Sequence, residues 1–377
     1  MNVTFFTLGC KVNQYETQCL KEGFEKAGFT VVPDKANFDI AVINSCTVTA
    51  ESDRKTRQTL RRFRRENPNA VIILTGCMVQ AFSKEAKDLC EADIVVGNTD
   101  VGKIIGLTET FLATGERIFD VTPHERTERF NTPDITRFDE RTRAYMKIED
   151  GCDRYCSYCI IPYARGFVRS KPIEEIKKEA ETLAQNGYIE VVLVGINLSS
   201  YGKGGNINLC DAVDAVCQVE GIKRVRLGSL EPDHISDEML NRFKAQPKFC
   251  PQFHLSLQSG CDETLKRMNR HYDSQFYRDL VLRIRNIFTD AAITTDIMVG
   301  FAGETEEEFN KSLDFAKEIG FAKAHIFAYS RRAGTVAYSL GGQVTNAEKS
   351  RRSGLMIAAT RESEDKFNSE IRGHPPR

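Results

Sequence analysis

The 377-residue sequence predicts an α/β protein made of a parallel sheet with covering helices, followed by a partial barrel of six β/α units. Short apolar runs alternate with helix-like segments along most of the chain, which is the pattern of strands joined by crossover helices. The length suits two domains, and 41% hydrophobic residues can form a sizeable core. We expect the sheet domain over residues 1–119, a linker over 120–143 and the barrel over 144–377.

The N-terminal part is predicted to contain four strands, over Val3–Leu8, Ile40–Ile43, Val71–Leu74 and Ile94–Val96. The second run is apolar throughout, as expected of a strand that is covered on both faces. Helices are expected over residues 15–27 and 50–66, with a glycine after the first and an Asn-Pro pair after the second. We expect a flavodoxin-like parallel arrangement.

Three cysteines of this part follow three separate predicted strands. Cys10, Cys46 and Cys77 each come directly after an apolar run, and Gly9 and Gly76 precede two of them in positions that suit tight turns. Because parallel strands end at the same edge of a sheet, we expect the three thiols to converge there. A single cysteine is more often a buried core thiol. Three at matching strand ends favour a metal cluster.

Residues 120–143 form a polar stretch that contains Pro123 and Pro133 and shows neither a helical nor a strand period. This pattern predicts a connector that lies over the surface. Its arginines are interleaved with acids, so we expect an ordinary surface here and not an RNA contact. We expect His124 to be a surface residue as well.

The barrel is predicted from six strand-like runs with helical segments between most of them. Pro172 near the start of one helix and a capping box at Thr305-Glu306-Glu307-Glu308 mark helix starts. Loops after barrel strands carry function in folds of this kind. The predicted strands are Ala144–Ile148, Glu190–Val194, Arg224–Leu227, Phe253–Leu257, Thr294–Val299 and Ala324–Ala328.

The loop after the first barrel strand contains Cys152, Cys156 and Cys159 at a C-x3-C-x2-C spacing. Three thiolates can hold three irons of a [4Fe–4S] cube and leave one iron open to a small molecule, whereas four-cysteine runs fill every corner and suit electron carriers. A structural zinc site needs a fourth ligand, and no Cys or His follows at finger spacing. Three buried thiols that merely lie close together are the remaining alternative.

This loop, with the aromatic Tyr158 before its last cysteine, resembles the radical S-adenosylmethionine (SAM) motif. The resemblance implies that Cys152, Cys156 and Cys159 hold a [4Fe–4S] cluster and that the amino-acid end of SAM chelates the open iron. The implied chemistry is reductive cleavage of SAM to methionine and a 5′-deoxyadenosyl radical, which removes hydrogen from an unactivated C–H bond.

The segments Leu8–Gln14, Asn44–Val48 and Thr75–Gln80 are similar to the N-terminal motifs of the methylthiotransferases. The resemblance implies that Cys10, Cys46 and Cys77 hold an auxiliary [4Fe–4S] cluster, which delivers sulfur that a second SAM methylates. The other cysteines match no motif and are expected to be ordinary thiols: Cys19, Cys90, Cys210, Cys217, Cys250 and Cys261.

The residues after the other barrel strands resemble the family's SAM-binding loops, although glycines in such places are usually just turns. Arg270 could clamp the SAM carboxylate as a bidentate partner, or it could be an ordinary surface arginine. Ala302 stands where a proline is often found, which we expect to affect loop stiffness more than binding. The remaining expected SAM contacts are Gly195, Asn197, Ser229, Glu231 and Gln258.

The predicted helix over residues 50–66 is strongly basic, with no acid between Arg54 and Arg65. Like charges three and four residues apart repel, so the pattern favours a polyanion partner over a merely solvated face. The net charge of −1 means that RNA would be met by such a local patch. The expected RNA-binding residues are Arg54, Arg57, Arg61, Arg62, Arg64 and Arg65.

Within the family, Thr7–Glu16 most resembles the branch that acts on N6-threonylcarbamoyladenosine at position 37 of tRNA, beside the anticodon. The implied product is the 2-methylthio derivative, and the implied partners are the tRNA anticodon arm and an electron donor such as flavodoxin or ferredoxin. Methylthiolation of a ribosomal-protein aspartate, or of a different modified adenosine in tRNA, is an alternative. A two-cluster electron-transfer protein is another, which the open-iron spacing disfavours.

Two expectations concern the cell and the end of the chain. The start of the sequence lacks the features of a signal peptide and no apolar run is long enough to span a membrane, so we expect a cytoplasmic protein. The family usually carries a small RNA-binding β-barrel, the TRAM domain, at its C-terminus. The sequence stops shortly after a predicted helix over residues 350–371, so we expect this barrel to be absent.

Overall fold

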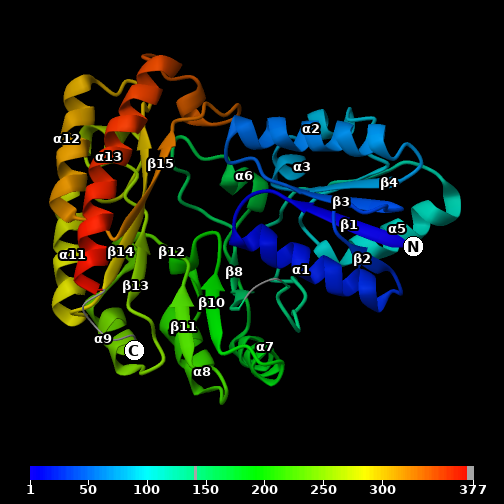
Figure 1. Ribbon diagram of the computed structural model, residues 1–377, viewed down its shortest axis with the longest axis horizontal. Coiled ribbons are helices and arrows are strands. Elements are labelled where there is room, and N and C mark those ends of the chain that lie inside the picture. The colour runs from blue at the N-terminus through cyan, green and yellow to red at the C-terminus, as the bar shows by residue number, and fades with distance from the viewer. Residues whose placement is uncertain (140–141, 372–377) are drawn as a thin grey trace.

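The computed structural model describes residues 1–139 and 142–371. An N-terminal sheet with helices on both faces packs beside an open barrel, and helix α1 lies where the two meet (Figure 1). The expected mixed α/β architecture with parallel sheets is confirmed.

Six parallel strands form the N-terminal sheet, in the order β2-β1-β3-β4-β5-β6. The first five follow the flavodoxin-like order. The sequence prediction missed β2 and β6, because each has three residues and neither is fully buried, so no run of apolar residues marks it. The strands are β1 (Asn2–Thr7), β2 (Thr30–Val32), β3 (Ile40–Ser45), β4 (Val71–Gly76), β5 (Ile94–Val96) and β6 (Ile118–Asp120).

Alternate side chains of the buried strand β3 point to opposite faces of the sheet, and each face is covered by its own helices. Ala41 and Ile43 belong to the core under helix α2, whereas Ile40 and Val42 belong to the core under α1 and α5. The helix α1 begins one turn earlier than the sequence predicted, directly after Cys10. The helices of this part are α1 (Lys11–Lys26), α2 (Ala50–Glu66), α3 (Cys77–Ala81), α4 (Ser83–Lys87) and α5 (Ile104–Thr114).

The barrel has the six expected β/α units, in two parallel sheets joined by a bridge between Val225 and Phe249. Its main strands are β7 (Ala144–Lys147), β10 (Glu190–Val194), β11 (Arg224–Leu227), β13 (Gln252–Leu255), β14 (Ala292–Val299) and β15 (Lys323–Ala328). The helices that follow them are α7 (Ile173–Gln185), α8 (Leu209–Gln218), α9 (Asp237–Ala245), α11 (Ser274–Ile287), α12 (Glu306–Ile319) and α13 (Asn346–Ile371). Shorter elements are β8 (Glu149–Asp150), β9 (Arg169–Ser170), β12 (Ser229–Leu230), α6 (Ile161–Arg165) and α10 (Asp262–Arg267).

Three further observations complete the description of the fold. The capping box predicted at the start of α12 is present, with Thr305 and Glu308 bonded to each other's backbone N–H. The last described element is α13, and the described residues contain no small β-barrel after it. Within residues 1–139 and 142–371, no helix is both long and apolar enough to cross a bilayer.

The connector after β6 is not the surface segment that the sequence predicted. Ile135 and Phe138 are buried in the barrel core, together with Val12 and Tyr15 of α1. The side chain of His124 is only 4% exposed, and its Nδ1 lies 2.7 Å from a carboxylate oxygen of Glu128. The few apolar residues scattered in this polar stretch give no helical or strand period, so this burial is decided by tertiary packing.

A buried ionic network joins the sheet to the barrel. Arg165 of α6 is fully buried and donates to both carboxylate oxygens of Glu16 in α1, as well as to Asn13 at 2.8 Å. Lys147 of β7 lies 2.7 Å from both Glu16 and Asp150. Burial alone would raise the pKa of the two carboxyl groups, but the nearby cations lower both pKa values below the ordinary range. The network therefore holds its carboxylates ionised.

Replacing the central cation should destabilise the protein strongly. Arg165→Met leaves Glu16 and Asp150 with too few cations inside the protein, and breaking a buried ion pair in this way costs about 3–5 kcal/mol. Urea unfolding measures the loss. Arg57→Met on α2 is the matched control, because Arg57 is exposed and a surface change of this kind costs within about 0.5 kcal/mol. Equal, small losses for the two variants would show that the network does not hold the fold together.

Candidate iron–sulfur centres

The sheet brings Cys10, Cys46 and Cys77 to the edge where the sequence places them. They follow β1, β3 and β4, which are neighbours in the sheet. Gly9 has a φ of +107°, and a Cβ there would lie 3.1 Å from the Sγ of Cys46. Gly76 has a φ of +98°, and a Cβ there would lie 2.5 Å from a backbone oxygen. Only glycine fits both turns, as the sequence suggested.

The environment of these thiols differs from one to the next. Cys46 and Cys77 are buried, whereas Cys10 is exposed. Burial raises the pKa of Cys77 to about 12, and the positive charge of Arg165 opposes that rise. The Nε of Arg165 lies 3.1 Å from the Sγ of Cys77. Because thiolates, and not thiols, bind metals, this arginine favours the ligating form of the sulfur.

The second cysteine trio lies on the loop between β8 and α6. The loop is held by its backbone: Cys152 N–H donates to Gly166 at 3.0 Å, and Ser157 N–H donates to Met268 at 3.0 Å. Burial, followed by the charge of Cys156, raises the pKa of Cys159 to about 12. The three sulfurs are thus close enough to influence one another.

Arg270 lies beside this loop. Its side chain is 2% exposed, which excludes the surface alternative. One terminal nitrogen lies 3.2 Å from the Sγ of Cys156 and the other lies 2.5 Å from a carboxylate oxygen of Glu231. Two residues that the sequence proposed for SAM are therefore in contact with each other and with a cysteine of the loop.

A third group of predicted residues surrounds the buried carboxyl of Glu149. Glu149 itself is not among the residues that the sequence predicts for the site. Asn197 donates its backbone N–H to Glu149 at 2.8 Å. A Cβ on Gly195 would lie 2.4 Å from the same carboxylate, so no larger residue fits there. The second carboxylate oxygen of Glu149 and the amide oxygen of Asn197 are buried and have no hydrogen-bond partner among the described residues.

These unpaired acceptors fit a ligand that carries hydrogen-bond donors, since buried polar atoms are otherwise almost always bonded. SAM has an ammonium group and ribose hydroxyls, and its expected iron ligands lie on the adjoining loop. Both cysteine trios offer the soft thiolate donors that iron–sulfur clusters use. The residues present therefore fit both kinds of group.

The other expected SAM contacts are more dispersed. Tyr158 packs edge-on against Phe301, with ring centroids 6.3 Å apart. Gln258 has a φ of +66° and its backbone N–H donates to Asp296 at 2.9 Å. Ser229 is exposed in β12. Burial raises the pKa of Tyr158 well above its ordinary value and the charge of Arg270 opposes that rise, so Tyr158 lies near Arg270.

Four of the arginines on the basic helix α2 form ion pairs with acidic residues. Arg64 donates to three backbone carbonyls and pairs with Asp93 at 2.6 Å, so it serves the fold. The acids that pair with three other arginines lie outside the acid-free run from Arg54 to Arg65. They are Glu51 for Arg54, Glu91 for Arg61 and Asp34 for Arg62. Lys55, Arg57 and Arg65 are exposed and form no ion pair with the described residues.

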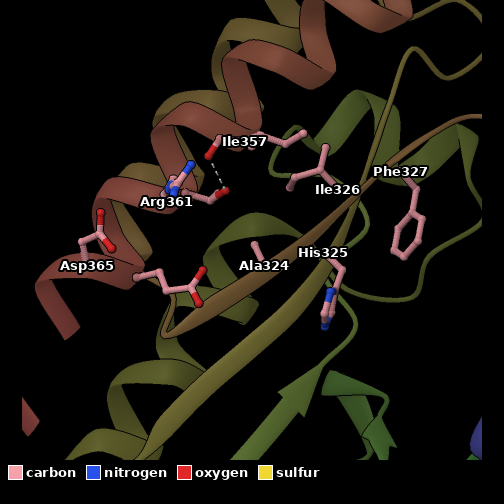
Figure 2. A pocket seen from close by; sticks show the side chains of 9 residues that line it. Ala324, His325, Ile326, Phe327, Ile357, Arg361 and Asp365 are labelled. Atoms are coloured by element: carbon pink, nitrogen blue, oxygen red, sulfur yellow. Dashed lines mark hydrogen bonds between the residues drawn. The ribbon is translucent and has the colours of Figure 1, made fainter. Parts of the chain in front are cut away.

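No three Cys, His, Asp or Glu side chains within the described ranges converge on a site for a single ion. A four-iron cluster attaches its cysteines to different irons, so the trios need no such convergence. A cavity of about 530 Å³ lies elsewhere, between β15 and α13 (Figure 2). Residues such as Ile326, Ile357 and Arg361 line it, and it contains no cysteine.

Sequence reasoning missed Glu149, Lys147, Asp150 and Arg165. The acid pair directly before the cysteine loop was a usable signal, because charged residues at the end of a buried strand need partners. Arg165 carries no such signal, since its partners come from α1 and from the sheet edge.

Comparison with known proteins places these features in a family. Residues 2–97 match the family described as "Uncharacterized protein family UPF0004", and residues 146–316 match the radical SAM superfamily. A threonylcarbamoyladenosine tRNA methylthiotransferase MtaB of Bacillus subtilis is 38% identical over 370 residues, which cover 98% of this chain and 82% of that protein. A tRNA-2-methylthio-N(6)-dimethylallyladenosine synthase of Natranaerobius thermophilus is 33% identical, with 97% and 83% covered.

A solved structure supports the fold. The radical SAM methyltransferase TsrM of Kitasatospora setae, with cobalamin and a [4Fe–4S] cluster bound, superposes with a TM-score of 0.64 at 14% identity, over 89% of this chain and 73% of that one. The family uses SAM and [4Fe–4S] clusters, in agreement with the sequence expectation. The chain therefore belongs to the tRNA methylthiotransferases of the radical SAM superfamily.

Proposed function

We propose that this protein converts N6-threonylcarbamoyladenosine at position 37 of tRNA to its 2-methylthio derivative. The observation that carries the proposal is the pair of three-cysteine sites, one of which contacts the buried Arg165, in a chain 38% identical to an enzyme named for this nucleoside. The relatives described above are named for tRNA adenosines, which favours tRNA over a ribosomal protein and a transferase over an electron carrier.

We propose that Cys152, Cys156 and Cys159 hold the cluster that binds SAM and that Cys10, Cys46 and Cys77 hold the auxiliary cluster. When bound, these groups supply radical cleavage of a C–H bond and the sulfur that replaces the hydrogen. The SAM pocket then comprises Tyr158, Gly195, Asn197, Ser229, Glu231, Gln258 and Arg270 of the sequence expectation.

The protein's own residues have positioning roles in this proposal. Arg270 holds Glu231 beside Cys156, and the free oxygens of Glu149 and Asn197 accept hydrogen bonds from SAM. Arg165 supplies positive charge to the sulfur of Cys77 from 3.1 Å away. No titrating acid–base pair is needed, because the hydrogen is removed by a radical.

We propose further that the exposed cations of α2, Lys55, Arg57 and Arg65, meet the phosphates of the anticodon arm. Free cations bind phosphates without giving up an existing ion pair, which Arg54, Arg61, Arg62 and Arg64 would have to do. An electron donor such as flavodoxin or ferredoxin reduces the SAM cluster. The reducing cytoplasm suits the twelve free thiols.

The substrate assignment is tested on tRNA from cells with and without the gene. Mass spectrometry of the nucleosides should show that 2-methylthio-N6-threonylcarbamoyladenosine disappears on deletion, while its unthiolated precursor accumulates. The wild-type gene should restore the product and a Cys152→Ala variant should not, because one iron of the SAM cluster then lacks its thiolate. An unchanged nucleoside profile in the deletion strain would refute the assignment.

The two cluster assignments are tested by iron content after anaerobic reconstitution. Two four-iron clusters give about eight irons per chain, and replacing either cysteine trio by alanine should leave about four. SAM binding should be lost with Cys152, Cys156 and Cys159 only. The control replaces Cys210, Cys217 and Cys250 by alanine and should keep the full iron content, while a loss of iron there would contradict the assignment.

The RNA contact is tested through its salt dependence. A double Arg57→Gln, Arg65→Gln variant should bind tRNA more weakly, with the slope of log K against log salt reduced by roughly 1–2, since each phosphate contact contributes about 0.9. The control is a double Lys177→Gln, Lys178→Gln variant on α7, because these two lysines, like Arg57 and Arg65, are exposed but belong to a different helix. Identical slopes for all three proteins would place the RNA elsewhere.

A further inference from the structure

Lys11 is a cation beside a cysteine of the proposed auxiliary site. It is the first residue of α1, directly after Cys10, and it makes no ion pair or hydrogen bond with the described residues. Its ammonium reaches across to the barrel, where it lies 5.9 Å from the ring centroid of Tyr145. The Lys11 side chain is exposed, so its ammonium is available to a ligand that lies between α1 and the barrel.

The barrel residues near Lys11 are polar. Along β14, Thr295 and Ile297 are buried, while Asp296 between them is partly exposed on the opposite face. Asp296 is in register with His325 of β15, and Figure 2 shows His325 projecting from β15 on the side away from α13. The two residues therefore face the barrel interior. Asp296 lies 3.3 Å from the ring of His254, and its charge acts on Lys11.

Two further charges act at this place. Arg143, just before β7, adds positive charge near Lys11 and is itself 3.5 Å from Glu190. Asp296 is the nearby negative group, and it contacts His254. The barrel thus presents a second cation and a carboxylate that can accept a hydrogen bond near the ammonium of Lys11.

The proposed substrate carries the matching groups. Threonine attached through a carbamoyl to N6 of adenine keeps its carboxylate and its hydroxyl, whereas the dimethylallyl group of the related substrate is apolar and uncharged. We propose that Lys11 binds the carboxylate of the threonylcarbamoyl group and so selects this nucleoside. The inference rests on the proposed function and names the residue that gives it specificity.

The chain order of Cys10 and Lys11 suits this role. The new sulfur is attached at C2 of the adenine, and the threonylcarbamoyl group is attached at N6, with only N1 between C2 and the carbon that carries N6. Cys10 belongs to the sulfur-donating site, and the next side chain extends from it toward Tyr145 and the barrel interior. A binding site built around one charged side chain disfavours an analogue that lacks the opposite charge, because that side chain is then left without an ion-pair partner.

The test compares two forms of the same tRNA, one with N6-threonylcarbamoyladenosine and one with plain adenosine at position 37. Dissociation constants are measured for the reconstituted holoenzyme, and their ratio gives the preference for the modified nucleoside. Phosphate contacts and iron content affect both tRNAs alike, so the ratio isolates the nucleoside contact. Lys11→Met keeps the apolar stem and removes the charge, and it should lower the preference about tenfold.

Two variants complete the design. Lys11→Arg restores the charge and should recover most of the preference. Lys26→Met is the matched control, because it removes an exposed lysine at the other end of the same helix, about 22 Å away at 1.5 Å per residue, and it should leave the ratio unchanged.

The outcomes separate the inference from the proposed function. A wild-type protein that binds both tRNAs equally would overturn the substrate assignment and the inference together. A wild-type protein with a clear preference that Lys11→Met retains in full would overturn only the role of Lys11. A loss in Lys11→Met that Lys11→Arg repairs supports the contact.

Discussion

The fully buried guanidinium of Arg165 is the interaction on which the arrangement of this protein depends. It connects α1 through Glu16 and Asn13, the barrel through Asp150, and the sheet edge through Cys77. A buried charge is tolerated only when its partners are in place, and the planar fork of an arginine accepts few alternative arrangements. Satisfying this cation therefore ties α1, the barrel and the edge of the sheet that carries Cys77 to one another.

Helix α1 belongs to both halves of the molecule. Leu20 and Phe24 pack into the core of the sheet, whereas Val12 and Tyr15 pack into the core of the barrel. Farther along the same interface, Arg332 after β15 reaches Asp53 of α2 at 2.5 Å. A change at the start of α1 therefore acts on the auxiliary cysteines and on the barrel interior together, which is the physical setting of Lys11.

The proposed site for SAM combines buried polar groups that lack hydrogen-bond partners in the absence of a ligand. Burial raises the pKa of Glu149 well above its ordinary value, and one of its oxygens lacks a partner among the described residues. A ligand with ammonium and hydroxyl donors removes this cost, because buried acceptors gain most from a bond that water cannot supply. Gly195 leaves the space in which Glu149 lies, and the pair of Arg270 with Glu231 closes the site beside Cys156.

Local patterns were enough to predict the parallel α/β class, the six β/α units and the cysteine loop over residues 152–159, while Cys10, Cys46 and Cys77 were grouped from their positions after predicted strands. The sequence also offered Arg270 and Glu231 as candidate SAM contacts. Only the tertiary structure decided that Ile135 and His124 are buried, that Arg64 is bound within the fold, and that Arg165 and Glu149 lie at the centre of the sites. Their partners come from segments distant in the chain, so no local pattern of residues could reveal them.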